Sequence, residues 1–187
     1  QHVSTRWIVD PLDGTTNYVH GFPMYGVSIA LQVDGEVIVG VIADPVRRRL
    51  FHAERGQGAF CNDEKLSVSD CNELEKALVG TGFPYDRHEH ADRYLAYVSC
   101  VMKKVQGIRR AGAACMDMAM VASGQLDGFW EFHLAPWDVA AGLLLIEEAG
   151  GKVTGHGGQP MDLDHPSPLA SNGRIHDAMQ ELLASVR

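Results

Sequence analysis

Hydrophobic and polar residues alternate along the first half of the chain with the two-residue period of a β-strand. Residues 27–33 follow this alternation, Asp34 and Gly35 form a pair typical of a tight hairpin turn, and residues 37–43 repeat the pattern. A short strand-like run at residues 50–53 is followed by a glycine-rich turn that leads into another strand. The pattern therefore predicts a β-rich region in this half of the chain.

The second half of the chain alternates between helical and strand patterns. Residues 88–105 carry apolar side chains at helical spacing, and residues 139–149 are largely apolar and are followed by Gly150 and Gly151, a typical helix end. The same reasoning predicts helices over residues 113–122 and 175–186, strands over residues 77–81, 107–109, 126–132 and 169–171, and an exposed loop over residues 154–160. Strands that alternate with helices indicate a layered α/β arrangement.

Composition and charge narrow the class of protein. The chain has 187 residues, of which 45% are hydrophobic and 21% charged, as in globular proteins. A net charge of −8 with thinly spread basic residues argues against a nucleic-acid partner. No apolar run is long enough to span a membrane, and four dispersed cysteines indicate reduced thiols in a cytoplasmic protein. We expect the scattered histidines, including His88 and His90, to lie at the surface.

An unusual concentration of acidic and hydroxyl side chains follows the apolar residues 7–9. Pro11 lacks an N–H group and cannot continue a sheet ladder, so we expect the strand to end near Asp10. Asp13 begins a turn, and residues 15–17 are of types that favour a helix start. Open α/β sheets bind ligands at the carboxyl ends of their strands, and the N–H groups of a helix start can hold a phosphate.

The spacing of Asp10 and Asp13 is compatible with a metal site. Two neighbouring carboxylates repel each other, and a divalent cation removes that repulsion. With the backbone carbonyl of Leu12 between them they offer hard oxygen ligands, which suit Mg²⁺ rather than zinc. The alternative is a plain turn held by Asp side-chain hydrogen bonds, and spacing alone does not separate the two. The adjacent Thr-Thr-Asn favours metal and phosphate binding.

A third carboxylate, Asp138, stands in the first turn of the apolar helix near residue 139. A helix that is apolar all round must be buried, so its N-terminus points into the protein, where the helix dipole favours a negative charge. The alternative is a plain helix cap. Capping accounts for the aspartate but not for Pro136 and Trp137 before it.

Together these stretches resemble the inositol monophosphatase family, part of the superfamily of Mg-dependent, lithium-sensitive sugar phosphatases. WIVDPLDGTTNYVHG resembles the first family signature and WDVAAGLLLIEEAGG the second, with GAACMD and DGFWEF between them in the family's order. The resemblance implies an α/β fold, an alternating α/β/α/β/α sandwich with its N-terminal part truncated. Residues 1–76 would be the C-terminal part of a metal-binding α+β subdomain, and residues 77–187 an α/β subdomain that completes the active site.

The resemblance also implies a hydrolase that cleaves a small phosphate monoester, with myo-inositol 1-phosphate as the expected substrate. The implied enzyme uses two or three Mg²⁺ ions, is inhibited by Li⁺ and forms a homodimer. Thr15 and Asp13 would be catalytic, with the Thr15 hydroxyl orienting the attacking water. Glu131 would accept hydrogen bonds from inositol hydroxyls, or would be a solvent-facing strand residue. The implied metal ligands are Asp10, Leu12, Asp13 and Asp138, and the implied substrate-binding residues are Asp13, Gly14, Thr15, Gly112, Ala113, Ala114, Glu131 and Asp138.

One departure from the family leaves alternatives open. The family supplies a further metal-binding glutamate upstream of the first signature, whereas residues 2–6 hold no acid. We therefore expect the sequence to be a piece of a longer chain. Within the class, the substrate could instead be another sugar or polyol phosphate, such as fructose 1,6-bisphosphate. Outside it, the chain could be a non-catalytic interaction protein on the same fold.

Overall fold

The computed structural model describes residues 4–186, which form two sheets together with several helices. The first sheet runs in the order β1 (Thr5–Asp13), β2 (Gly26–Val33), β3 (Glu36–Asp44), β4 (Arg49–Glu54), β5 (Gly58–Cys61) and β6 (Glu64–Lys65). The second runs in the order β10 (Lys152–Gly155), β11 (Pro168–Ser171), β9 (Gly128–Trp130), β7 (Leu78–Thr81) and β8 (Gly107–Arg109). The helices are α1 (Thr15–Val19), α2 (Arg87–Met102), α3 (Ala114–Ala122), α4 (Pro136–Glu148) and α5 (His176–Ala184), with a short 3₁₀ helix, η1 (Leu74–Lys76).

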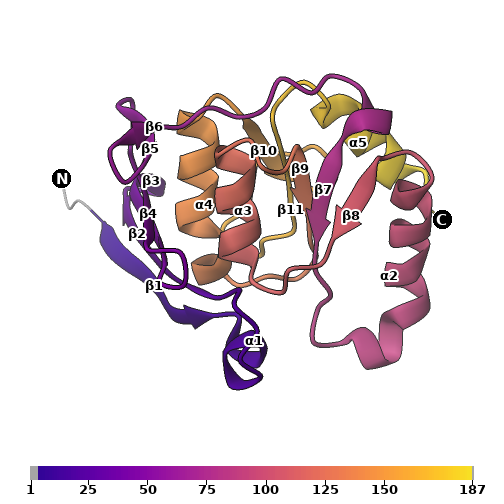
Figure 1. Cartoon of the computed structure of the whole chain (residues 1–187), viewed down its shortest axis with the longest axis horizontal. Coiled ribbons are helices and arrows are strands. Elements are labelled where there is room, and N and C mark those ends of the chain that lie inside the picture. Colours follow the sequence, from indigo (N-terminus) through magenta and orange to yellow (C-terminus); the bar gives the residue numbers. More distant parts are fainter. Residues whose placement is uncertain (1–3, 187) are drawn as a thin grey trace.

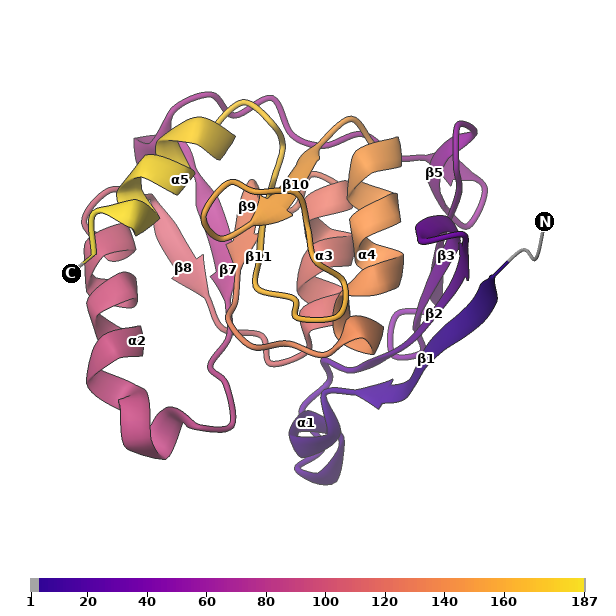
Figure 2. The same cartoon turned by 180° about the vertical axis from the view of Figure 1, so that it is seen from behind.

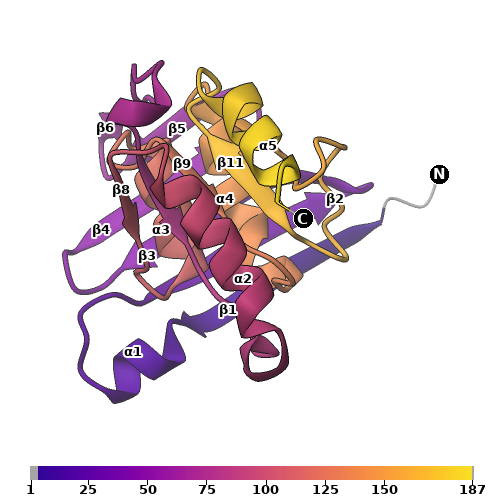
Figure 3. The same ribbon diagram turned by 90° about the vertical axis from the view of Figure 1, so that its right-hand side faces the viewer.

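The elements stack as four layers. Helices α3 and α4 lie between the two sheets, and α2 and α5 cover the opposite face of the second sheet (Figure 1), an order that is also visible from behind (Figure 2). Seen from the side of α2 and α5, the strands of the first sheet lie behind α3 and α4 (Figure 3). This arrangement confirms the predicted mixed α/β class, and its four layers alternate between sheets and helices as the expected sandwich does.

The central position of α4 explains its apolar sequence. All residues from Val139 to Ile146 are buried, because α4 contacts strands of both sheets. A helix enclosed in this way has no polar face to offer water. The start of α4, and with it Asp138, is therefore held in a fixed place between the two sheets. The expected subdomain boundary at residue 76 falls between β6 and β7, and the division itself stays a proposal.

The first hairpin and the main helices confirm the sequence pattern, but two boundaries were wrong. Strand β1 does not end near Asp10: it continues to Asp13, with a register shift against β2 between these residues. Pro11 is tolerated because β1 is the outer strand of the described sheet, where one edge of its backbone needs no partner. The expected loop over residues 154–160 was also wrong at its start, because Thr154 is buried in β10 and pairs with β11.

His176 contradicts the expectation that the histidines lie at the surface, since it is fully buried. Thr154 Oγ1 donates to the carbonyl of Gly155 at 2.9 Å, so it accepts a hydrogen bond from His176 Nε2–H at 3.0 Å. Ser171 Oγ accepts from the Gly173 N–H at 3.1 Å, which leaves its own proton for His176 Nδ1 at 2.9 Å. The network fixes a neutral imidazole that ties α5 to the second sheet.

The buried imidazole predicts a loss of stability in acid. Burial, and then the charge of Lys152, lower the pKa of His176 to about 4, with Asp177 opposing them. The unfolded chain takes up this proton near pH 6.5, so the stabilisation is complete above that pH and is lost as the pH falls from 6.5 towards 4. The slope is at most about 1.4 kcal/mol per pH unit. Denaturant unfolding of the wild type and of His176→Gln at several pH values measures it.

The exposed His88 provides the matched control, because it lies at the surface in α2. We expect His88→Gln to keep the wild-type pH dependence and His176→Gln to lose its share between pH 6.5 and 4. Equal slopes for the wild type and His176→Gln would contradict the assignment.

Two other expectations concern the whole described chain. Cys61, Cys71, Cys100 and Cys115 are free thiols, as the sequence indicates. Between residues 4 and 186, none of the helices has both the length and the hydropathy that crossing a membrane requires.

Candidate active site

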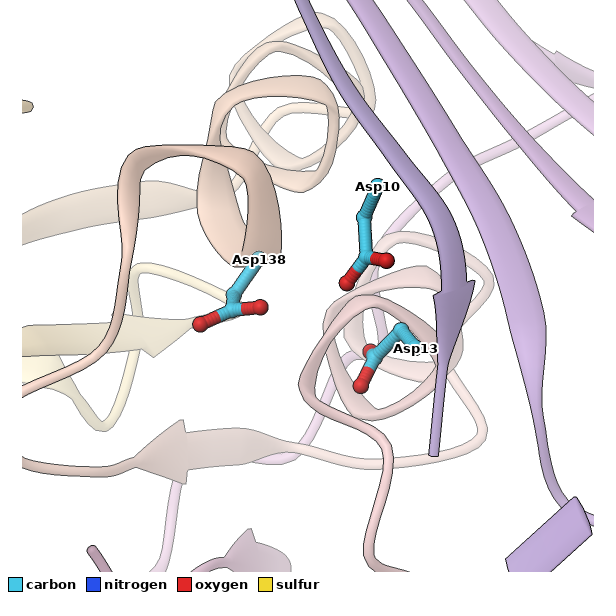
Figure 4. A group of neighbouring side chains, drawn as sticks. All are labelled: Asp10, Asp13 and Asp138. Carbon is cyan, nitrogen blue, oxygen red and sulfur yellow. The ribbon is translucent and has the colours of Figure 1, made fainter. Parts of the chain in front are cut away.

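Three aspartates from distant parts of the chain converge at one end of the molecule. Asp10 and Asp13 come from β1, and Asp138 comes from the first turn of α4; each offers a carboxylate oxygen, and these oxygens lie within 4.8 Å of one another. Figure 4 shows the three carboxylates directed towards a common space between the strand and the helix start. The structure thus brings together the three acidic residues singled out in the sequence.

A backbone hydrogen bond orients each of these carboxylates. Asp10 Oδ1 accepts from the Leu12 N–H at 2.9 Å, and Asp138 Oδ2 accepts from the Ala135 N–H at 2.7 Å. Asp13 Oδ2 accepts from the Cys115 N–H at the start of α3, at 2.7 Å. The turn and cap interpretations are therefore both correct, yet they do not exclude a shared site. One oxygen of each group is held by the backbone, and acceptor capacity is left over for a ligand.

Burial, with a smaller contribution from the neighbouring negative charges, raises the pKa values of two members. Burial is the main cause of the raised pKa of Asp13; the Cys115 N–H opposes it and the charge of Asp10 adds to it. Burial also raises the pKa of Asp138 to about 7, opposed by the Ala135 N–H and increased by Asp13 and Asp10. Without a counter-ion, Asp138 therefore retains its proton in part near neutral pH. A bound cation would displace that proton.

The donor set fits a hard divalent cation such as Mg²⁺. The group contains carboxylate oxygens and no nitrogen or sulfur ligand, which is the chemistry Mg²⁺ prefers. Oxygens around an octahedral Mg²⁺ at about 2.1 Å lie about 3–4.2 Å apart, close to the spacing of the three oxygens. Small adjustments of the side chains are sufficient to surround an ion.

The segment after Asp13 lies directly against the start of α3. Gly14 has φ of 83°, and a β-carbon there would lie 2.9 Å from the Met24 carbonyl oxygen and 3.1 Å from the Ala113 β-carbon, so only glycine fits. The Asn17 amide group donates to the Met24 and Ala111 carbonyls at 2.6 and 2.8 Å, which ties α1 to the chain before α3. Two helix starts, at α1 and α3, therefore meet beside the carboxylates.

The remaining predicted residues surround this junction. Thr15 is exposed, and its hydroxyl donates to the Leu12 carbonyl oxygen at 3.1 Å. Ala113 and Ala114 form the N-cap and first residue of α3, and Gly112, with φ of 88°, places its backbone beside the Asn17 side chain. All of these residues lie near the junction of α1 and α3. Their roles in binding and catalysis are a proposal.

Glu131 lies outside the group of three but shares its environment. It follows β9 and is only 8% exposed, so the alternative of a solvent-facing strand residue is wrong. Burial raises the pKa of Glu131 to about 8, with Arg110 opposing the increase and Asp13 and Asp138 adding to it. An uncharged carboxyl is the predominant form at neutral pH. Such a group both donates and accepts hydrogen bonds.

Asp117 in α3 is a further buried acid beside the site that the sequence pattern did not single out. It is 1% exposed, its Oδ1 atom has no hydrogen-bond partner, and burial raises its pKa well above the ordinary value, with the charges of Glu131 and Asp13 adding to the effect. A single aspartate within the apolar run ACMDMAMVA was the available signal. The contact of Asp13 with the Cys115 N–H left no such signal, because any residue except proline offers an N–H.

Comparison with known proteins agrees with this geometry. The sequence profile of the inositol monophosphatase family matches residues 1–187, the full extent of the chain. The chain belongs to the inositol monophosphatase family. A relative from Mesorhizobium japonicum named inositol-1-monophosphatase is 49% identical over 93% of this chain and 65% of its own length. The Nus factor SuhB of Pseudomonas aeruginosa is 46% identical over 92% of this chain and 65% of its own length.

A solved structure shows that the likeness extends to the fold. The inositol monophosphatase of Anabaena (Nostoc) superimposes with a TM-score of 0.95 at 46% identity, covering 98% of this chain and 73% of that protein. Family membership confirms the resemblance seen in the two signatures. This chain spans about two thirds of the length of the curated relatives, so the activity of the whole protein is a separate question.

Proposed function

We propose that this member of the inositol monophosphatase family is a Mg²⁺-dependent hydrolase of phosphate monoesters, with myo-inositol 1-phosphate as its substrate. The observation that carries the proposal is the convergence of Asp10, Asp13 and Asp138 within 4.8 Å beside two helix starts. The names of the Mesorhizobium relative and of the Anabaena structure support the choice of inositol phosphate.

In this proposal the metal-binding residues are Asp10, Asp13, Asp138 and the Leu12 carbonyl oxygen. When bound, two or three Mg²⁺ ions neutralise the charge of the phosphate and lower the pKa of the attacking water. The Cys115 N–H orients the Asp13 carboxylate before a metal binds, and the Ala135 N–H orients the Asp138 carboxylate in the same way. Preset ligands reduce the reorganisation that binding requires.

The same junction would hold the substrate. The N–H groups of Gly14 and Thr15 at the start of α1 bind the phosphate oxygens. The Thr15 hydroxyl donates to the Leu12 carbonyl oxygen, so its lone pairs are free to accept a proton of the attacking water and orient it. Gly112, Ala113 and Ala114 line the pocket with small side chains, and Glu131 binds hydroxyls of the inositol ring. Water then attacks in line, without a phosphoenzyme intermediate.

A panel of phosphate monoesters tests this function. We expect Mg²⁺-dependent release of phosphate from myo-inositol 1-phosphate with a higher kcat/KM than from fructose 1,6-bisphosphate or phenyl phosphate, and inhibition by Li⁺. The measurement is initial phosphate release from each ester with and without Mg²⁺. Faster turnover of fructose 1,6-bisphosphate would replace inositol phosphate with another sugar phosphate as the substrate. Absence of turnover for every ester would refute the enzymatic proposal.

A second candidate is a non-catalytic interaction protein on the same fold. The observation that favours it is the name of the Pseudomonas relative, a Nus factor rather than a phosphatase. Retention of all three acidic residues in one converging group favours the enzyme, because an interaction surface does not require half-buried carboxylates at this spacing. The two candidates differ in their response to Asp13→Asn, which should abolish turnover but leave a partner complex intact.

The proposal also includes a cytoplasmic homodimer. Exposed apolar side chains of Tyr18, Val19 and Phe22 on and after α1 provide a surface of the kind that dimers bury. Sedimentation of the purified protein measures the oligomeric state.

A further inference from the structure

Glu131 owes its position to a missing side chain on the neighbouring strand. Thr81 at the end of β7 pairs with Trp130 at the end of β9, and its hydroxyl donates to the Trp130 carbonyl oxygen at 2.9 Å. The next residues of the two strands, Gly82 and Glu131, therefore lie side by side. On the other side, the Glu131 N–H donates to the Pro168 carbonyl oxygen at 3.3 Å, so the backbone of Glu131 is held from both directions.

The Glu131 carboxyl occupies the space where a side chain of residue 82 would be. A β-carbon built on Gly82 would overlap both carboxyl oxygens and the carbon between them, far inside any tolerated contact. Gly82 is not in the left-handed region, so backbone freedom does not account for this glycine. The requirement at position 82 is therefore one of space, and the group that uses the space is a carboxyl of the proposed substrate site.

The ionisable groups around the Glu131 carboxyl favour a hydroxyl as the group that it binds. The ionisable groups that face it are Asp13 on β1, Asp138 on α4, Asp117 on α3 and Arg110 before α3. A negative charge on Glu131 would add to the charges of these aspartates and would repel the substrate phosphate held near Asp13. An enclosed, uncharged carboxyl avoids this repulsion and offers one donor and one acceptor, which complements neighbouring hydroxyls of a polyol.

We propose that Gly82 is a positioning residue that seats the Glu131 carboxyl against the site and thereby selects phosphate esters whose organic part carries hydroxyl groups. The inference rests on the proposed phosphatase function and assigns to the end of β7 a role in choosing the substrate. Gly82 touches no substrate atom in this account and acts through Glu131 alone. A merely structural glycine would instead affect every substrate through the stability of the fold.

A double-mutant cycle with two substrates tests the proposal. We expect Gly82→Ala to raise KM for myo-inositol 1-phosphate about tenfold, as expected when well-placed hydrogen bonds are lost. The kinetic constants for phenyl phosphate, which has no hydroxyl, should stay within about twofold of the wild type. Glu131→Ala, which removes the carboxyl, should show the same selectivity, and the double variant should be no worse than either single variant. Gly107→Ala, in β8 of the same sheet, is the matched control, because the nearest side-chain atoms around it are flexible ends.

Shortening the acid provides a rescue that a structural role does not predict. If Gly82→Ala folds poorly, Gly82→Ala with Glu131→Asp should recover the wild-type melting temperature, because the shorter side chain leaves the occupied space. Glu131→Asp alone should raise KM for the inositol ester as Gly82→Ala does. Equal losses on both esters, additive effects in the cycle, or an unchanged KM for the inositol ester would each overturn the proposal.

An NMR titration separates this proposal from the proposed function. The Glu131 carboxyl carbon should titrate near pH 8 in the wild type and at a lower pH in Gly82→Ala, whether or not the protein hydrolyses any ester. An unchanged titration in the variant would overturn the claim that Gly82 positions the Glu131 carboxyl. A shifted titration in a protein that cleaves no ester would refute the enzymatic proposal but would support the positioning of Glu131 by Gly82.

Discussion

Asp13→Asn is expected to lower kcat for phosphate release by about three orders of magnitude or more while the fold stays intact. Asparagine keeps the shape of the side chain, and its amide oxygen can still accept from the Cys115 N–H, as Asp13 does at 2.7 Å. The negative charge that holds a cation next to the phosphate is lost. Steady-state hydrolysis in saturating Mg²⁺, together with circular dichroism, measures both parts of the prediction.

The control for Asp13→Asn is the same substitution at an exposed acid. Asp63 lies in the turn between β5 and β6 and is exposed, so Asp63→Asn should retain wild-type turnover. We expect Asp10→Asn and Asp138→Asn to behave like Asp13→Asn. Turnover retained by any one of the three would remove that residue from the metal site.

Mg²⁺ is expected to raise the melting temperature of the wild type by about 5–10 °C at a concentration one hundred times its dissociation constant. An ion that binds only the folded protein contributes about 2.7 kcal/mol at that concentration, and each kcal/mol shifts the melting temperature of a chain of this length by about 2–4 °C. Only the folded chain brings Asp10, Asp13 and Asp138 together, so the unfolded chain offers no comparable site. Thermal melts with and without Mg²⁺ provide the measurement.

Without a bound ion, the ionised carboxylate of Asp138 destabilises the folded protein. Burial raises the pKa of Asp138 to about 7, above its value in the unfolded chain, so its ionisation disfavours folding as the pH rises from 4 through 7. Asp138→Asn should therefore melt at a higher temperature than the wild type without Mg²⁺ at pH 8, and should lose most of its response to the ion. A wild type that shows no shift at millimolar Mg²⁺ would favour the non-catalytic interaction protein.

The sequence pattern predicted the helices and strands of the layers better than the residues at which these elements end. Alternation over residues 27–33 and the apolar run after Asp138 each follow from burial, which leaves a direct imprint on hydropathy. The end of β1 depends on which strand lies outermost in the sheet, and that is decided by tertiary pairing rather than by Pro11 itself. Thr154 was misplaced for a similar reason, because its hydroxyl is satisfied by distant groups that local sequence does not reveal.

Some residues of the candidate site could likewise be predicted from the sequence, and others could not. Asp10, Asp13 and Asp138 could be found from the sequence, because carboxylates beside an apolar run and at the start of an apolar helix need an explanation. The seat of Glu131 could not be found, because Gly82 has no side chain whose chemistry would attract notice. Its function is the space it leaves, which is visible only when the neighbouring strand is in place.

A crystal of the protein grown with Mn²⁺ in place of Mg²⁺ tests the central claim most directly, because the anomalous signal of manganese locates the ion without assumptions about its ligands. The account predicts a peak within about 2.0–2.3 Å of carboxylate oxygens of Asp10, Asp13 and Asp138. A peak elsewhere, or three carboxylates that turn away from one another in the presence of the ion, would contradict it.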